Sequence, residues 1–247
     1  MDFGRALVLV LVGFVPSIVW LVYYLRKDCH PEPKSLIART MAAGILTAPL
    51  AVIAQLGFSQ LAKYYWLGYD PFASLAFFLW AALVEEYVKF LAVKVAILDN
   101  PEFDEPTDAM VYMISAALGF AAIENILVLY GAIPDGVGAT LRIWVLRFAG
   151  ATLLHTIASA IMGYCLGLAW FYRNHSRKLI AGGLALATFT HFVFNVTLLE
   201  STSRWWGFAA TTVALLLLVV MISYLFNRLR DRITIHHSNL AEGKNLV

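Results

Sequence analysis

The segment LVEEYVKF, residues 83–90, places three charged side chains in the middle of an otherwise apolar stretch. A charged side chain at the centre of a bilayer costs about 3 kcal/mol or more, so such groups usually have a function. Glu85 and Lys89 are four residues apart and Glu86 and Lys89 three apart, so each pair shares a helical face. Lys89 is therefore expected to neutralise one carboxylate and leave the other to act on water or to bind a metal.

Further polar side chains occur inside three other apolar segments: Glu124, His155, His191 and Asn195. Counted from the cytoplasmic ends of the predicted helices, Glu86 and these three ionisable groups lie about 12 to 16 residues in, or about 18 to 24 Å deep. Four helices thus bring an ionisable group to nearly one level. We expect the groups to converge on one pocket.

One chemistry that fits this set is hydrolysis of a peptide bond without metal. Glu85 and Glu86 are the candidate general bases, with Lys89 as the charge partner, because a carboxylate can take a proton from water. A histidine would carry protons, and Asn195 would orient the scissile carbonyl and stabilise the developing oxyanion. Adjacent glutamates point about 100° apart on a helix, so one is the reactive group and the other a support.

The second chemistry uses a zinc ion. Glu124, His155 and His191 would be the ligands and Glu86 the base, since two histidines and a glutamate form a known catalytic zinc set. The H-E-x-x-H signature of many zinc proteases is absent from the sequence. The cofactor is therefore either zinc or none, and the residues leave both mechanisms open.

The composition places these groups in an integral membrane protein. Hydrophobic residues make up 61% of the 247 and charged residues only 14%, a balance that soluble domains do not keep. The apolar runs are continuous and long enough to cross about 30 Å of hydrocarbon as helices, which predicts an all-α bundle. Seven spans are expected at residues 4–25, 36–57, 73–98, 109–131, 142–171, 179–200 and 207–226.

Basic residues predict the orientation of the bundle. They gather in alternate connections and in the tail: Arg26, Lys27, Lys34, Arg39, Arg173, Arg177, Lys178, Arg228, Arg230, Arg232 and Lys244. The positive-inside rule then puts the N-terminus outside and the C-terminus in the cytoplasm. Because topology explains these charges, no nucleic-acid partner is expected. The chain is interpreted as one membrane domain, 1–247, with a cytoplasmic tail at about 227–247.

Other residues in the spans have more ordinary expected roles. Lys94 is interpreted as a side chain that extends to the interface. Ala116 with Gly119, and Gly163 with Gly167, would let neighbouring helices approach closely. Arg147, near the outer end of the fifth span, receives no role from the sequence.

The motifs along most of the chain resemble those of the PrsW intramembrane proteases, which are related to CAAX-processing and Abi-type membrane peptidases. The resemblance covers about residues 26–196. It rests on KDCHPEPKSLIAR, VEEYVKF with its E-E-x-x-K pattern, FDEPTDAMVY, GFAAIENIL, HTIASAIMGYCLG and HFVFNV. His191 and Asn195 agree with the H-x-x-x-N motif of the CAAX-type relatives, whereas those relatives have a histidine at the position of Glu124.

The resemblance implies a multi-pass peptidase of a prokaryotic cytoplasmic membrane. Its implied partner is a membrane-anchored regulatory protein, typified by an anti-sigma factor cut on its extracytoplasmic side. Three alternatives remain. A proton-coupled transporter or channel also buries such groups, but would predict inverted repeats that the sequence does not show. The others are a non-catalytic scaffold and a CAAX-type peptidase acting on lipidated or bacteriocin peptides.

Overall fold

The computed structural model describes residues 3–28, 30–65, 74–201 and 205–241, and these residues form helices without β-strands. The α-helices are α1 (Phe3–Leu25), α2 (Lys34–Tyr65), α3 (Leu75–Ala96), α4 (Asp108–Ala132), α5 (Val137–Leu146), α6 (Thr152–Phe171), α7 (Ser176–Ser201) and α8 (Trp205–Ala241). A π-helical turn, η3 (Arg147–Ala151), joins α5 to α6, and short 3₁₀ turns, η2 (Ile133–Asp135) and η4 (Arg173–His175), precede α5 and α7. The predicted all-α fold is confirmed.

Six helical segments within the described residues are long and apolar enough to cross a membrane: α1, α2, α4, the continuous α5–α6 segment, α7 and α8. α3 has 22 residues, which gives about 33 Å of helix and is also sufficient length. It differs from the six because it contains Glu85, Glu86, Lys89 and Lys94. Counting α3, the chain is a polytopic bundle of about seven long helical segments, as the sequence predicts.

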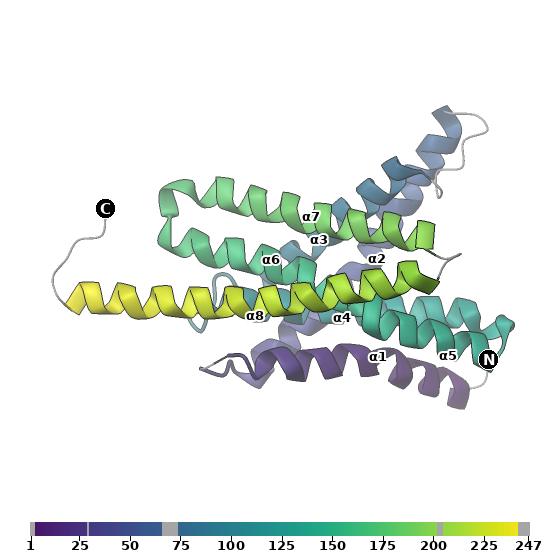
Figure 1. Ribbon diagram of the computed structural model, residues 1–247, viewed down its shortest axis with the longest axis horizontal. Coiled ribbons are helices and arrows are strands. Elements are labelled where there is room, and N and C mark those ends of the chain that lie inside the picture. The colour runs from purple at the N-terminus through teal and green to yellow at the C-terminus, as the bar shows by residue number, and fades with distance from the viewer. Residues whose placement is uncertain (1–2, 29, 66–73, 202–204, 242–247) are drawn as a thin grey trace.

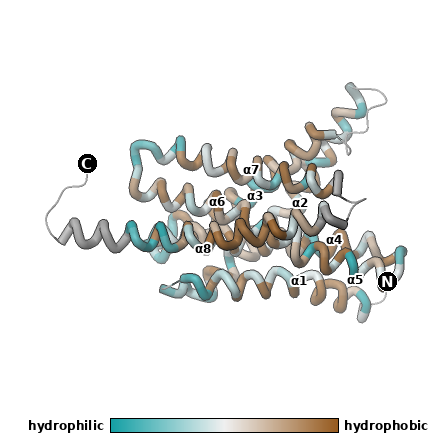
Figure 2. Tube along the Cα trace, viewed as in Figure 1, coloured by the Kyte–Doolittle hydropathy of each residue, from teal (hydrophilic) through white to brown (hydrophobic). Residues whose placement is uncertain are grey.

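The helices lie roughly side by side, with the start of α1 and the end of α8 at opposite ends of the bundle (Figure 1). Hydrophilic residues gather at the ends of the bundle, at the α1–α2 and α6–α7 connections and on α8 around residues 227–232 (Figure 2). Apolar residues dominate the helices between these ends. The N-outside orientation stays a prediction, and a split of the termini between two faces agrees with it.

α4 is the centre of the bundle and packs against α1, α2 and α6. Its first four turns are buried, and the approach of α2 there depends on glycine. A Cβ added at Gly44 would lie 2.0 Å from the carbonyl oxygen of Ala116, and one at Gly119 would lie 2.0 Å from the carbonyl oxygen of Met41. The two backbones are therefore too close for any side chain, and the expected close approach at Ala116 and Gly119 is confirmed.

The motif KDCHPEPKSLIAR, after α1, contacts the motif FDEPTDAMVY, at the start of α4. Nδ1 of His30, in the α1–α2 connection, lies 2.9 Å from a carboxylate oxygen of Glu105, and this interaction raises the pKa of His30. The hydroxyl of Tyr112 donates to the carboxylate of Glu32. The carboxylate of Asp108 accepts the backbone N–H of Glu105 at 2.8 Å, which fixes the loop before α4. These contacts tie α1 and α2 to the start of α4.

Replacing Gly119 with Ala is expected to lower the free energy of unfolding by about 1–3 kcal/mol, because the added methyl group must separate α2 from α4. The measurement is thermal unfolding of the detergent-solubilised protein. Gly57→Ala is the matched control, since a Cβ at Gly57 on α2 meets no atom within 4 Å. Equal stability of the two variants would contradict the close approach.

Candidate active site

Four helices bring six of the seven predicted site residues into one buried cluster. α3 contributes Glu85, Glu86 and Lys89, α4 contributes Glu124, α6 contributes His155 and α7 contributes His191. All are buried except Glu124, whose side chain is 31% exposed. The expected convergence at one level is therefore present in the tertiary structure.

The carboxylate of Glu86 is fully engaged. Its Oε1 accepts from Nζ of Lys89 at 2.7 Å and lies 2.8 Å from Nδ1 of His191, while Oε2 accepts the hydroxyl of Ser159 at 3.3 Å. Neither Glu86 nor Lys89 is exposed at all. A carboxylate with both oxygens bonded is a poor base, which favours Glu86 as the supporting member of the glutamate pair.

Glu85 has the opposite environment. One oxygen, Oε1, accepts the side-chain amide of Gln55 from α2 at 2.8 Å, which fixes the orientation of the carboxylate. The other oxygen, Oε2, is buried and forms no hydrogen bond. It lies 3.7 Å from Nε2 of His191 and 4.0 Å from Nδ1 of His155. Since buried carboxylate oxygens normally have a partner, this atom indicates a site for a ligand or a reacting molecule.

The neighbours of each histidine dictate its tautomer. For His155, Nδ1 lies 2.8 Å from Nζ of Lys89 and Nε2 lies 2.7 Å from Oε2 of Glu124. A lysine ammonium only donates and a carboxylate only accepts, so Nδ1 carries the lone pair and Nε2 the hydrogen. For His191, Nδ1 donates to Glu86 and Nε2 carries the lone pair. The two rings thus use opposite tautomers, and the lone-pair nitrogen of each lies within 4.0 Å of Oε2 of Glu85.

This donor set fits a metal ion. One ligand atom each from Glu85, His155 and His191 lies within 4.8 Å of the other two. Ligand atoms about 2 Å from a tetrahedral zinc are about 3.3 Å apart, close to the separations at Oε2 of Glu85. The carboxylates on the far nitrogens resemble the second shell of zinc-bound histidines. A metal would need the Nδ1 lone pair of His155, which Lys89 occupies in this structure.

Glu124 lies at the outer nitrogen of His155 rather than among these three donors. Its Oε2 also accepts from the guanidinium of Arg147 at 2.7 Å. Its expected role as a ligand is not tested by this contact and stays a prediction. Asn195, one turn beyond His191 on α7, is half-buried and makes no hydrogen bond or ion pair with the described residues of the cluster.

Sequence reasoning missed two residues that hold the cluster, Gln55 and Ser159. Each had a weak signal. Gln55 is a lone amide inside an apolar span, and Ser159 follows His155 by four residues and so shares its helical face. Neither signal says which carboxylate is bound, because that depends on how α2 and α6 pack on α3.

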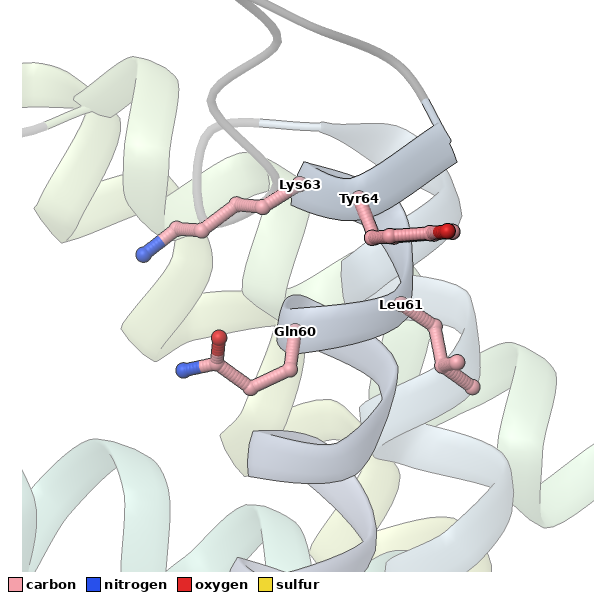
Figure 3. Close-up of a pocket in the computed structure, with 4 residues that line it drawn as sticks. All are labelled: Gln60, Leu61, Lys63 and Tyr64. Carbon is pink, nitrogen blue, oxygen red and sulfur yellow. The ribbon is translucent and has the colours of Figure 1, made fainter.

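A surface pocket at the far end of α2 is separate from this cluster. Gln60, Leu61, Lys63 and Tyr64 line it. Gln60 and Lys63 point to one side of the helix, and Leu61 and Tyr64 point to the other (Figure 3). None of the predicted site residues lines this pocket.

A family comparison agrees with the motifs and the buried cluster. The model of a family described as "PrsW family intramembrane metalloprotease" matches residues 32–225. The chain belongs to this PrsW family. It is therefore a peptidase embedded in the membrane, with a protein substrate, and the family match favours this reading over a transporter or a scaffold.

Curated PrsW relatives match most of the chain. The protein is 33% identical to Protease PrsW of Geobacillus kaustophilus over 199 residues, which are 80% of this chain and 82% of the relative. It is 32% identical to Protease PrsW of Oceanobacillus iheyensis, over 85% of this chain and 88% of the relative. The match to Protease PrsW of Clostridioides difficile is 26% identical over 96% of both chains. No solved structure gives a significant match.

Lys89→Met is expected to lower the free energy of unfolding by about 3–5 kcal/mol, because it leaves the carboxylate of Glu86 buried without its cation. Thermal unfolding in detergent measures this. Lys94→Met, an exposed lysine on the same helix, is the control and should change stability little. The double variant Glu86→Gln with Lys89→Met should recover part of the loss, and no recovery would argue against the ion pair.

Proposed function

We propose that this PrsW protein hydrolyses a peptide bond of a membrane-anchored protein with a water molecule bound beside Oε2 of Glu85. The observation that supports this most is the unbonded state of that oxygen between the lone-pair nitrogens of His155 and His191. A reacting water would donate one hydrogen bond to this oxygen and one to the lone pair of Nε2 of His191, while Nδ1 of His155 accepts from Lys89. No other carboxylate oxygen of the cluster has this arrangement among the described residues.

The remaining residues have supporting roles in this proposal. Gln55 fixes Glu85, so that Oε2 faces the histidines. Glu86, neutralised by Lys89, holds the ring of His191. Asn195, one turn along α7, would hold the oxygen of the scissile carbonyl, which stabilises the negative charge that develops there.

We also propose that the resident cofactor is zinc, with Glu85, His155 and His191 as its ligands. The description of the family as metalloproteases supports this, together with the donor set. Bound zinc supplies Lewis acidity, which activates water at neutral pH and polarises a carbonyl. The ligand set inferred from the sequence had Glu124 in place of Glu85, and the contact of Glu124 with the outer nitrogen of His155 favours the exchange.

The substrate class follows from where the cluster lies. A peptide bond must enter the bundle between helices to reach it, so an extended segment near a membrane anchor suits the site better than a soluble loop. The chain is a multi-pass membrane protein with bacterial relatives. We propose first-site cleavage of an anti-sigma factor in the cytoplasmic membrane as its role, which rests on the family resemblance alone.

Glu85→Gln is expected to lower kcat for a membrane-anchored reporter by about 10²–10⁴-fold, because the amide neither accepts a proton from water nor binds a metal well. Cleavage in proteoliposomes, followed on gels, measures this. Glu102→Gln, in the exposed loop after α3, is the matched control and should cleave like the wild type. Activity in Glu85→Gln near the wild-type level would overturn the assignment.

Purified protein is expected to contain about one zinc per chain, and His155→Ala and His191→Ala are expected to lose it. Glu124→Gln should keep the metal with about 10–100-fold weaker affinity, because it removes only a second-shell contact. Elemental analysis and chelator titration measure these changes, with the exposed His175→Ala as control. Full cleavage by metal-free protein would instead make Glu85 a direct base.

A further inference from the structure

Arg147 is a charged residue near the cluster that the proposed mechanism does not use. Its NH2 group donates to Oε2 of Glu124 at 2.7 Å, and its Nε donates to Oδ1 of Asn125 at 2.5 Å. The side chain of Arg147 is only 14% exposed. Oε2 of Glu124 is also the atom that accepts Nε2–H of His155. One carboxylate oxygen is thus shared between the arginine and the histidine.

The π-helical turn η3 explains how Arg147 and His155 reach the same oxygen. The two residues are eight positions apart, and in an uninterrupted α-helix their side chains would point about 80° apart. A π-turn contains one extra residue, so the eight positions behave like seven α-helical steps and the difference in direction falls to about 20°. Arg147 is the first residue of this turn, which ends at Ala151. The irregular turn therefore aligns the arginine with the histidine.

Glu124 needs this second contact because it is the least buried member of the cluster. Its side chain is 31% exposed, whereas His155 is 2% exposed. A partly exposed glutamate with one partner has several rotamers available, and a charge-assisted bond to a planar guanidinium restricts them. The hydrogen bond from Nε of Arg147 to Asn125 fixes the guanidinium itself. Asn125 is held in turn, because it donates to Oγ1 of Thr152 at 3.1 Å.

We propose that Arg147 is a positioning residue of the protease, which acts through Glu124 to hold the ring of His155 with its hydrogen on Nε2 and with Nδ1 beside Lys89 and Glu85. The proposal rests on the proposed function of the cluster. Arg147 touches neither Glu85 nor the two lone-pair nitrogens, so its effect on catalysis passes through Glu124. The competing role is a purely structural ion pair that only fastens α4 to the α5–α6 segment.

A double-mutant cycle separates the two roles. Arg147→Gln is expected to lower kcat by about 10–100-fold with little change in KM, as removal of second-shell contacts does. The double variant Arg147→Gln with Glu124→Gln should be no slower than Glu124→Gln alone, because both changes break the same chain of contacts. Arg147→Lys keeps the positive charge but lacks the planar guanidinium, and it should be more active than Arg147→Gln. Arg142→Gln, exposed on α5, should cleave like the wild type.

Additive losses of kcat in the double variant would overturn the proposal. A loss of kcat that correlates with the thermal unfolding temperature would also overturn it, because a structural ion pair predicts that correlation. The variants to compare are Arg147→Gln, Arg147→Lys and Asn125→Ala. Asn125→Ala removes the hydrogen bonds of this residue with Arg147 and Thr152, so its main expected effect is on stability rather than on kcat.

A readout without cleavage keeps this inference separate from the proposed function. The protein has six histidines, and selective ¹⁵N labelling with NMR in detergent reports which ring nitrogen carries the hydrogen. The signal that disappears in His155→Ala belongs to His155. It should show a hydrogen on Nε2 in the wild type and a mixture of the two tautomers in Arg147→Gln. If the wild type cleaves no reporter, the proposed function fails while this measurement stands. An unchanged His155 signal in Arg147→Gln would overturn the role of Arg147.

Discussion

The ion pair between Glu86 and Lys89 is the interaction on which the rest of the site depends. Both side chains are fully buried, and their charged atoms lie 2.7 Å apart within one helix. A charge in the bilayer is tolerated when it is paired inside the protein, so this pair allows α3 to cross with its carboxylates. The same two residues extend to both histidines, since Glu86 bonds His191 and Lys89 bonds His155. The same contacts therefore neutralise the charges on α3 and orient the two histidine rings.

Charge balance in the cluster explains why Glu85 differs from its neighbour. Glu86 is paired with Lys89 and Glu124 with Arg147, which leaves the carboxylate of Glu85 without a cation. With neutral histidines, three carboxylates and two cations leave one negative charge unmatched. A bound divalent cation would compensate for that charge, and a bound water would solvate it by donating a hydrogen bond. The fold thus pairs two of the three carboxylates and leaves Glu85 without a cation, which supports our proposal that Glu85 is the reactive one.

Packing around α4 supplies the rigidity that these contacts require. Glycines let the backbones of α2 and α4 touch, and α6 approaches α4 as closely, since a Cβ added at Gly163 would lie 2.6 Å from Cα of Met110. α2 provides Gln55 and α6 provides His155, so both supporting helices are fixed against the same central element. Small residues thereby hold the helices at the separation over which short polar side chains can bond.

The sequence by itself determined the fold class, the spans and the residue types of the site. Continuous apolar runs specify helices because every backbone polar group must be satisfied within the segment. Charged residues at one depth in several spans predicted their convergence, and the spacing within residues 85–89 predicted that Lys89 neutralises one of the two glutamates. These features depend on local periodicity and on the bilayer, which any single helix already reflects.

Only the tertiary structure decided how the polar groups are divided among themselves. The sequence could not distinguish Glu85 from Glu86, because neighbouring residues differ by one helical step and the choice depends on which face α2, α6 and α7 cover. Nor could it show that Glu124 contacts Nε2 of His155, because that contact depends on how α4 packs on α6. It gave Arg147 no role, because the π-turn that aligns Arg147 with His155 breaks the 3.6-residue period from which faces are inferred. Contacts between helices, and irregularities within them, are properties of the packed bundle and have no signature in the period of a single helix.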